Sequence, residues 1–118
     1  MKKNSYYFLS SLNYTNLEQV RNCKIEKIIK YKLFKKAAFV KIDIPIEYNN
    51  TYYDHVFLIS RHKGYDLSKI KVFPFFVYVC ILKNGENNFG QKIRIHDFEN
   101  IGCAELYETE KSAKNHLF

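Results

Sequence analysis

The chain has 118 residues, of which 47% are hydrophobic and 17% aromatic, a composition that excludes a disordered segment and leaves no room for two independent cores. We therefore predict one globular domain over residues 1–118. The 19 Lys and Arg residues outnumber the 12 Asp and Glu residues, and the formal charge of +7 fits either an acidic partner or simple solubility of an aromatic-rich protein.

The N-terminal region predicts a short strand followed by a short helix. Two lysines precede an apolar run at residues 5–9. This run is too short for a signal peptide, is followed by Ser10 and Ser11, and has no small-residue cleavage site. We expect a strand there instead, and Thr15 or Asn16 is placed to cap a helix that ends at Val20.

Residues 24–34 fit two kinds of secondary structure. Ile29, Tyr31 and Leu33 alternate with lysines, as in a half-buried strand, but the apolar residues of this segment also fit one face of a helix. We favour the strand. A helix at residues 24–34 would change the fold class to α+β.

Residues 36–46 carry the clearest strand signal. Their apolar side chains recur at every second position and share one face, whereas Lys41 and Asp43 lie on the other. Pro45 cannot donate to a neighbouring strand, so it predicts a sheet edge or a departure from the sheet at that end. Residues 47–51 predict a turn.

The strand predicted at residues 52–60 returns antiparallel and is apolar on both faces, which indicates a central position. Residues 70–83 predict the longest strand, also apolar on both faces, with Pro74 marking a bulge or an edge. A strand that is buried on both faces and bent suits a barrel or a tightly curled sheet.

The C-terminal third predicts two more short strands and a helix. A reversal at residues 84–90 precedes a strand at 92–96 with Lys92, Arg94 and His96 facing outward. Residues 100–102 predict a turn, and residues 104–108 predict a last strand. Thr109 is placed to cap a helix that begins at Glu110.

These elements predict a mainly β fold: a small antiparallel barrel or strongly curled sheet of about six strands, with one or two short helices. The longest apolar run, residues 72–82, is shorter than the roughly 20 residues that a membrane helix needs. We therefore expect no membrane span. The three cysteines form no CxxC pair, and this odd count fits a reducing cytoplasm better than a disulfide framework.

The most suggestive stretch for function is residues 61–66, a polar and mostly cationic loop between two apolar segments. Cations, an imidazole and a tyrosine ring on one loop suit a phosphate, a carboxylate or a nucleobase, although a solvated connection explains the same residues. If the strands pair in chain order, the outward stripe at 92–96 follows this loop in space. The predicted binding residues are Arg61, His62, Lys63, Tyr65, Lys92, Arg94 and His96, and lysines 30, 32, 35 and 36 extend the same basic face.

The sequence contains no recognisable catalytic or metal-binding motif. The four histidines show no HxxxH or HxH spacing and no acidic cluster accompanies them, so we expect no catalytic residue, no metal site and no cofactor. His62 and His96 would make a ribonuclease-like acid and base pair only if folding brought them within about 7 Å, roughly the span of a phosphate.

We therefore predict a non-enzymatic binding module that uses a basic, aromatic-bearing face to bind nucleic acid or an acidic protein surface. One alternative is a small inhibitor, immunity or accessory protein that blocks a partner's site. The other alternative is a metal-free ribonuclease-like enzyme.

Overall fold

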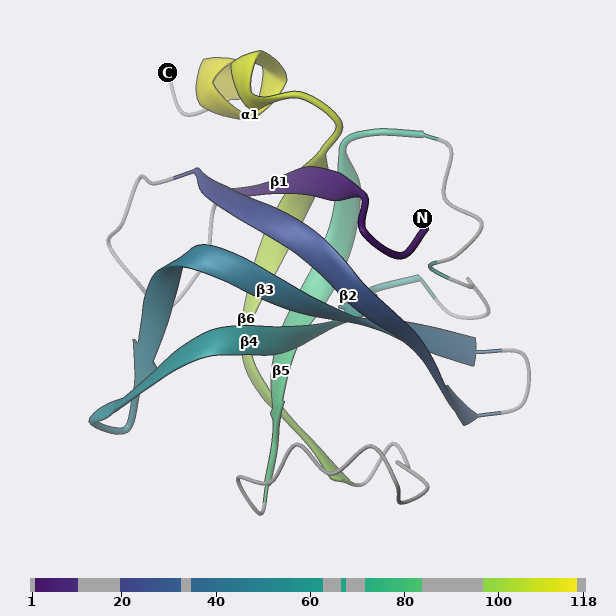
Figure 1. The fold of residues 1–118 in the computed structure, drawn as a ribbon, viewed down its shortest axis with the longest axis vertical. Helices are drawn as coiled ribbons and strands as arrows, with labels where there is room; N and C mark the ends of the chain where they lie inside the picture. The colour runs from purple at the N-terminus through teal and green to yellow at the C-terminus, as the bar shows by residue number, and fades with distance from the viewer. Residues whose placement is uncertain are drawn as a thin grey trace.

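The computed structural model describes residues 2–10, 20–32, 35–62, 67, 72–83 and 97–116. In this described part of the chain, six antiparallel strands follow one another in chain order, and β1 also pairs with β6, so the sheet closes into a barrel (Figure 1). The strands are β1 (Tyr6–Ser10), β2 (Arg21–Lys32), β3 (Lys35–Tyr48), β4 (Thr51–Ser60), β5 (Phe75–Leu82) and β6 (Phe98–Tyr107). The predicted fold class is confirmed.

The ambiguous segment at residues 24–34 is a strand over its described part, residues 24–32. It forms most of β2, which pairs with β3 over nearly its whole length, with bulges between Ile25 and Lys27 and between Lys30 and Lys32. The helical alternative is wrong because the β-branched and aromatic side chains of this segment pack against β3.

The predicted turn between β3 and β4 is a two-residue hairpin loop. Tyr48 pairs with Thr51, and Asn49 and Asn50 between them have φ angles of 51° and 64°. Asparagine tolerates this left-handed conformation, and two such residues in succession match the twist of the flanking strands.

The two predictions about strand ends have different outcomes. The pairing of β3 with β2 ends at Ile42, and its pairing with β4 is interrupted between Lys41 and Ile46, so Pro45 lies where the sheet needs no donor. The predicted edge position is confirmed, although β3 continues to Tyr48. The second prediction is wrong, because residues 100–102 form no turn. They lie within β6, where the Asn100 side-chain oxygen accepts a hydrogen bond from the Gly102 nitrogen at 2.9 Å, and the opposite strand shifts register.

The strand predicted at residues 70–83 begins later than expected. β5 starts at Phe75, directly after Pro74, and Val72 to Pro74 form a bend. The strand predicted at residues 92–96, the reversal at 84–90 and residues 17–19 of the predicted helix lie outside the described residues.

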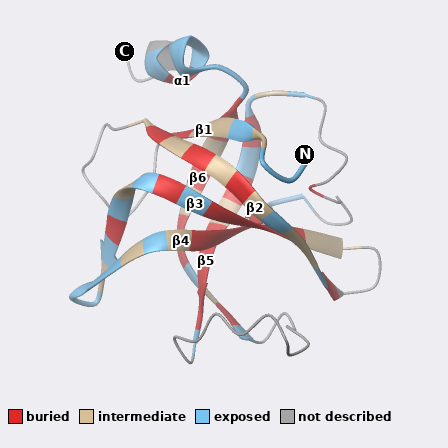
Figure 2. Ribbon diagram, viewed as in Figure 1, coloured by how far each residue is buried: buried red, intermediate tan, exposed pale blue. Residues whose placement is uncertain are grey.

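The interior of the barrel is filled mainly by aliphatic side chains. Alternate residues of every strand point inward, as the two-residue period requires, and Figure 2 shows the resulting bands of buried residues along the ribbon. Leu67, fully buried, joins this core from outside the strands. Members of this core on β2 to β5 include Ile25, Val40, Val56, Leu58, Val79 and Ile81.

A second apolar cluster lies on the outer surface of the barrel. Its members alternate along the strands with the interior residues, so they face the other way: Tyr31, Ala37, Phe39, Phe57, Ile59, Cys80, Leu82 and Phe98. This explains why the strands at 52–60 and 70–83 are apolar on both faces.

The helix α1 (Glu110–His116) follows β6 as predicted. The Thr109 hydroxyl accepts a hydrogen bond from the Ser112 nitrogen at 3.2 Å, which satisfies one of the donors left open at the helix start. The helix contacts β1 and β6 and buries Ala113. Within the described part of the chain, helices fall short of the length and apolarity that crossing a membrane requires.

Candidate functional site

The pairing of β4, β5 and β6 sets the order of side chains on the outer face. Phe57 pairs with Cys80, and Cys80 with Asn100. In the next outward row, Ile59 pairs with Tyr78. One row further, the backbone nitrogen of Arg61 donates a hydrogen bond to the backbone carbonyl of Phe76 at 3.1 Å. Because these rows alternate with inward-facing rows, all of these side chains lie outside the barrel.

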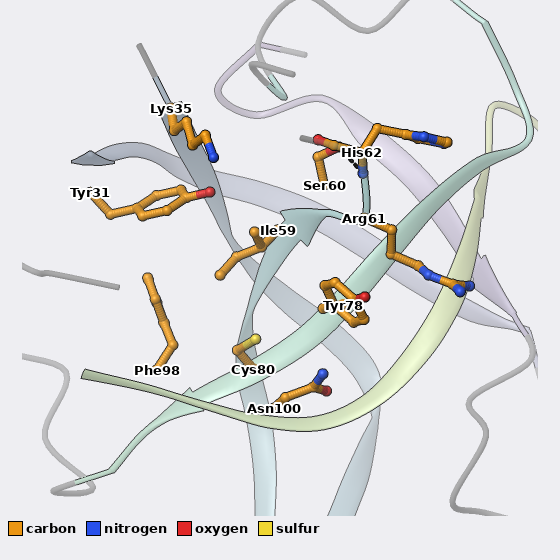
Figure 3. Close-up of a pocket in the computed structure, with 10 residues that line it drawn as sticks. All are labelled: Tyr31, Lys35, Ile59, Ser60, Arg61, His62, Tyr78, Cys80, Phe98 and Asn100. Carbon is orange, nitrogen blue, oxygen red and sulfur yellow. Dashed lines mark hydrogen bonds between the residues drawn. The ribbon is translucent and has the colours of Figure 1, made fainter. Parts of the chain in front are cut away.

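Beside this outer face lies a cavity of about 390 Å³. The pairing of β2 with β3 brings Tyr31 and Lys35 to it, although they are far in sequence from the rest of the wall. The volume falls in the range of about 300–1,000 Å³ that is typical of small-ligand pockets. The cavity, which we call the outer-face cavity, is lined by Tyr31, Lys35, Ile59, Ser60, Arg61, His62, Tyr78, Cys80, Phe98 and Asn100 (Figure 3).

Its two main cations stand on opposite sides. In Figure 3 the Lys35 amine and the Tyr31 hydroxyl point into the cavity from one side. Arg61 lies on the other side, with Ile59 and Tyr78 between them, and its guanidinium points outward, away from the centre of the cavity. None of the described residues that line the cavity carries a carboxylate. The site therefore has a cation on each of two sides, and its described lining residues carry no opposite charge.

Arg61 is held in place by aromatic rings. Its guanidinium carbon lies 5.8 Å from the centroid of the Phe76 ring and 5.6 Å from that of Tyr78. Cation–π attraction at these distances favours a fixed guanidinium over a freely moving one. Its planar donors thus remain available to an anion at the rim.

A small hydrogen-bonded turn fixes the chain after β4. The His62 nitrogen donates to the Ser60 hydroxyl at 3.0 Å, and that hydroxyl lies 3.0 Å from the His62 carbonyl, to which it donates. The His62 ring points away from the centre of the cavity (Figure 3) and lies 5.8 Å from the Phe75 ring. His62 therefore shapes the rim mainly through its backbone.

The opposite wall is aromatic. The rings of Tyr31 and Phe98 meet edge to face at 5.5 Å, and Phe57 contacts Phe98 at 5.2 Å, a geometry that stabilises aromatic pairs. Burial raises the pKa of the Tyr31 hydroxyl above its ordinary value of 10.0. Tyr31 therefore stays protonated at neutral pH and can donate a hydrogen bond into the cavity.

The cavity does not have the chemistry of a cysteine enzyme. Burial raises the pKa of the Cys80 thiol to about 12, so the nucleophilic thiolate is scarcely populated at neutral pH. Among the described residues there is also no group of three or more His, Cys, Asp or Glu side chains placed to hold a metal ion.

The structure places two of the predicted binding residues, Arg61 and His62, at this cavity. It also brings Lys35 there, one of the lysines expected on the same basic face. The other predicted residues, Lys63, Tyr65, Lys92, Arg94 and His96, lie outside the described part of the chain. The shared basic face and the pairing of His62 with His96 therefore remain predictions.

Sequence reasoning missed the apolar and neutral part of the wall. It assigned Tyr31, Tyr78 and Cys80 to strands without asking what their outward faces bordered. The sequence signal that could have indicated this wall is the apolar character of both faces of β4 and β5. A group of apolar residues on the outer face of a sheet indicates packing against another segment or a ligand-binding site.

A second hollow, of about 350 Å³, lies over β1, β2 and β3 and differs in charge. It combines lysines with carboxylates, and the Asn22 nitrogen donates to the Asp43 carboxylate at 2.8 Å. Its lining residues are Tyr6, Asn22, Lys24, Glu26, Lys41, Ile42 and Asp43. Mixed charge makes this polar hollow a poorer anion site than the outer-face cavity.

Comparison of the chain with protein-family models, with curated proteins and with solved structures finds no match.

Proposed function

We propose that this protein is a non-enzymatic binding module that binds single-stranded nucleic acid at the outer-face cavity. The observation that carries the proposal is the combination of aromatic rings with cations at both rims and no carboxylate among the described lining residues. Single-strand binders use the same combination, with cations on the backbone and aromatic rings on the bases. The formal charge of +7 supports it by attracting a polyanion.

The test is a titration of labelled single-stranded RNA and DNA of about eight nucleotides, followed by fluorescence anisotropy. We expect saturable binding that weakens steeply with salt, because phosphate contacts release counterions. Arg61→Ala and Lys35→Ala should each weaken binding and each lower the salt slope by about one.

Lys41→Ala is the matched control, since it removes one exposed lysine from the polar hollow. The proposal fails if no oligonucleotide binds at low salt. It also fails if Lys41→Ala weakens binding as much as Arg61→Ala does.

An acidic protein surface is the second candidate, and Phe76 favours it. This ring is 38% exposed beside the Arg61 guanidinium, and exposed aromatic rings next to arginines often anchor protein interfaces. Polyglutamate added as a competitor separates the two candidates. If it displaces the labelled oligonucleotide at the same charge concentration, an acidic protein is the better assignment; if it does not, nucleic acid is.

A further inference from the structure

The shape of the outer-face cavity limits how much of a nucleic acid strand can enter it. A flat aromatic platform would stack a row of bases, whereas this site is a hollow of about 390 Å³ with Cys80 and Asn100 in its wall. The barrel interior offers no alternative, because the aliphatic core fills it. The cavity has room for one base, and the rest of the strand must lie outside it.

The positions of the two cations indicate how a nucleic acid strand would lie across the cavity. Lys35 and Arg61 occupy opposite sides of the cavity, with Ile59 and Tyr78 between them (Figure 3). A free nucleotide with one phosphate can use only one of these sides. An internal nucleotide of a strand carries one phosphate before its ribose and one after it, so it can use both.

The polar groups inside the cavity are mostly hydrogen-bond donors. The Asn100 side-chain oxygen already accepts from the Gly102 nitrogen, so its amide nitrogen is the group left to contact a ligand. The Tyr31 hydroxyl and the Lys35 amine also point inward (Figure 3). A base with carbonyl acceptors, such as uracil, suits this lining.

From these features, and resting on the proposed function, we infer that the outer-face cavity accepts a single base turned out of a strand, flanked by one phosphate on Lys35 and one on Arg61. The base packs against Tyr31, Phe98 and Ile59, with its carbonyl edge toward Asn100. The shared chemistry of the ligand is a base on a ribose that carries two phosphates, found in a strand and in a free nucleoside bisphosphate.

Calorimetric titration compares uridine monophosphate with uridine bisphosphate, which carries phosphates at both ends of the ribose. We expect the bisphosphate to bind about tenfold or more tightly than the monophosphate, because it engages both cations. In Lys35→Ala and in Arg61→Ala this advantage should disappear. Equal affinities in the unchanged protein would overturn the inference.

Asn100→Asp tests the base-binding end with little disturbance of the fold. Aspartate keeps the oxygen that accepts from Gly102, but it replaces the amide donor by a negative charge. The change should weaken uridine bisphosphate about tenfold or more. Asn50→Asp is the control, because it makes the same charge change in the exposed hairpin loop, where aspartate tolerates the positive φ of 64°.

The outcomes separate this inference from the proposed function. Oligonucleotide binding that depends on Arg61 but is neither displaced by uridine bisphosphate nor weakened by Asn100→Asp overturns the inference and leaves the proposed function standing. Binding of uridine bisphosphate without any binding of oligonucleotides supports the cavity assignment, identifies the free nucleotide as the source and ends the proposed function. Absence of both kinds of binding ends both.

Discussion

The two apolar clusters of this barrel differ in composition and in how completely they are packed. The interior cluster is mainly aliphatic and filled to near-complete burial, whereas the outer cluster is rich in aromatic rings and borders a cavity with basic rims. Neighbours on one strand illustrate the division: Leu58 points into the barrel and Ile59 points to the cavity. The difference teaches that the inner face of the sheet serves stability and that its outer face is the place to look for binding.

The largest effect is expected from truncating the interior. Leu58→Ala should lower the free energy of unfolding by about 2–5 kcal/mol, because it opens a void among fully buried neighbours, and should leave oligonucleotide affinity unchanged in the folded protein. Ile59→Ala should lower the free energy of unfolding by an amount at the low end of that range, because Ile59 borders an existing cavity. Unlike Leu58→Ala, this variant should weaken oligonucleotide binding. Chemical denaturation and anisotropy measure the two quantities. The division of roles is wrong if both variants lose affinity equally.

An intermediate effect is expected from alkaline pH. Burial holds the pKa of Cys80 near 12, above its ordinary value of 9.0, so its contribution to stability is complete below pH 9.0 and is lost as the pH rises toward 12. Burial also raises the pKa of the Cys23 thiol, which lies in the interior of the barrel.

Denaturation midpoints measured from neutral to alkaline pH check this expectation. Cys80→Ala should reduce the fall in stability above pH 9.0, and Cys23→Ala should do so as well. An alkaline fall in stability that neither variant alters would show that the thiols are not its cause.

The smallest effect is expected at the start of α1, which contacts β1 and β6 and contributes none of the described residues that line the outer-face cavity. Thr109→Ala removes the acceptor of the Ser112 nitrogen and should cost about 0.5–2 kcal/mol. Thr109→Ser keeps that hydroxyl and should restore most of the loss. Thermal unfolding measures both variants, and a change in oligonucleotide affinity would contradict the separation of this helix from the binding face.

Much of the fold could be predicted because its signals are local. The two-residue alternation of β3 placed Val40 and Ile42 inside the barrel, and Thr109 marked the helix start. The prediction failed at Asn100 and Gly102, because the residue types that make a turn also make an irregularity within a long strand. Whether a turn or an irregularity within the strand results depends on pairing with β5, and the local sequence does not contain that information.

The candidate site could be predicted only in part. Arg61 stood out as a cation in a loop between apolar strands. Its partners Lys35, Tyr31 and Phe98 come from distant strands, and they meet only because the sheet closes and the β2–β3 hairpin lies beside β4. The sequence pattern indicated that both faces of β4 are apolar, but it could not show that a cavity lies on the outer face.

The most direct test of the binding site is a heteronuclear NMR titration of the barrel with single-stranded RNA of about eight nucleotides. Binding at the outer-face cavity should shift the amide signals of Tyr31, Arg61 and Asn100 and leave those of the polar hollow, such as Lys24 and Lys41, in place. Shifts concentrated at the polar hollow, or spread evenly over every exposed lysine, would contradict it.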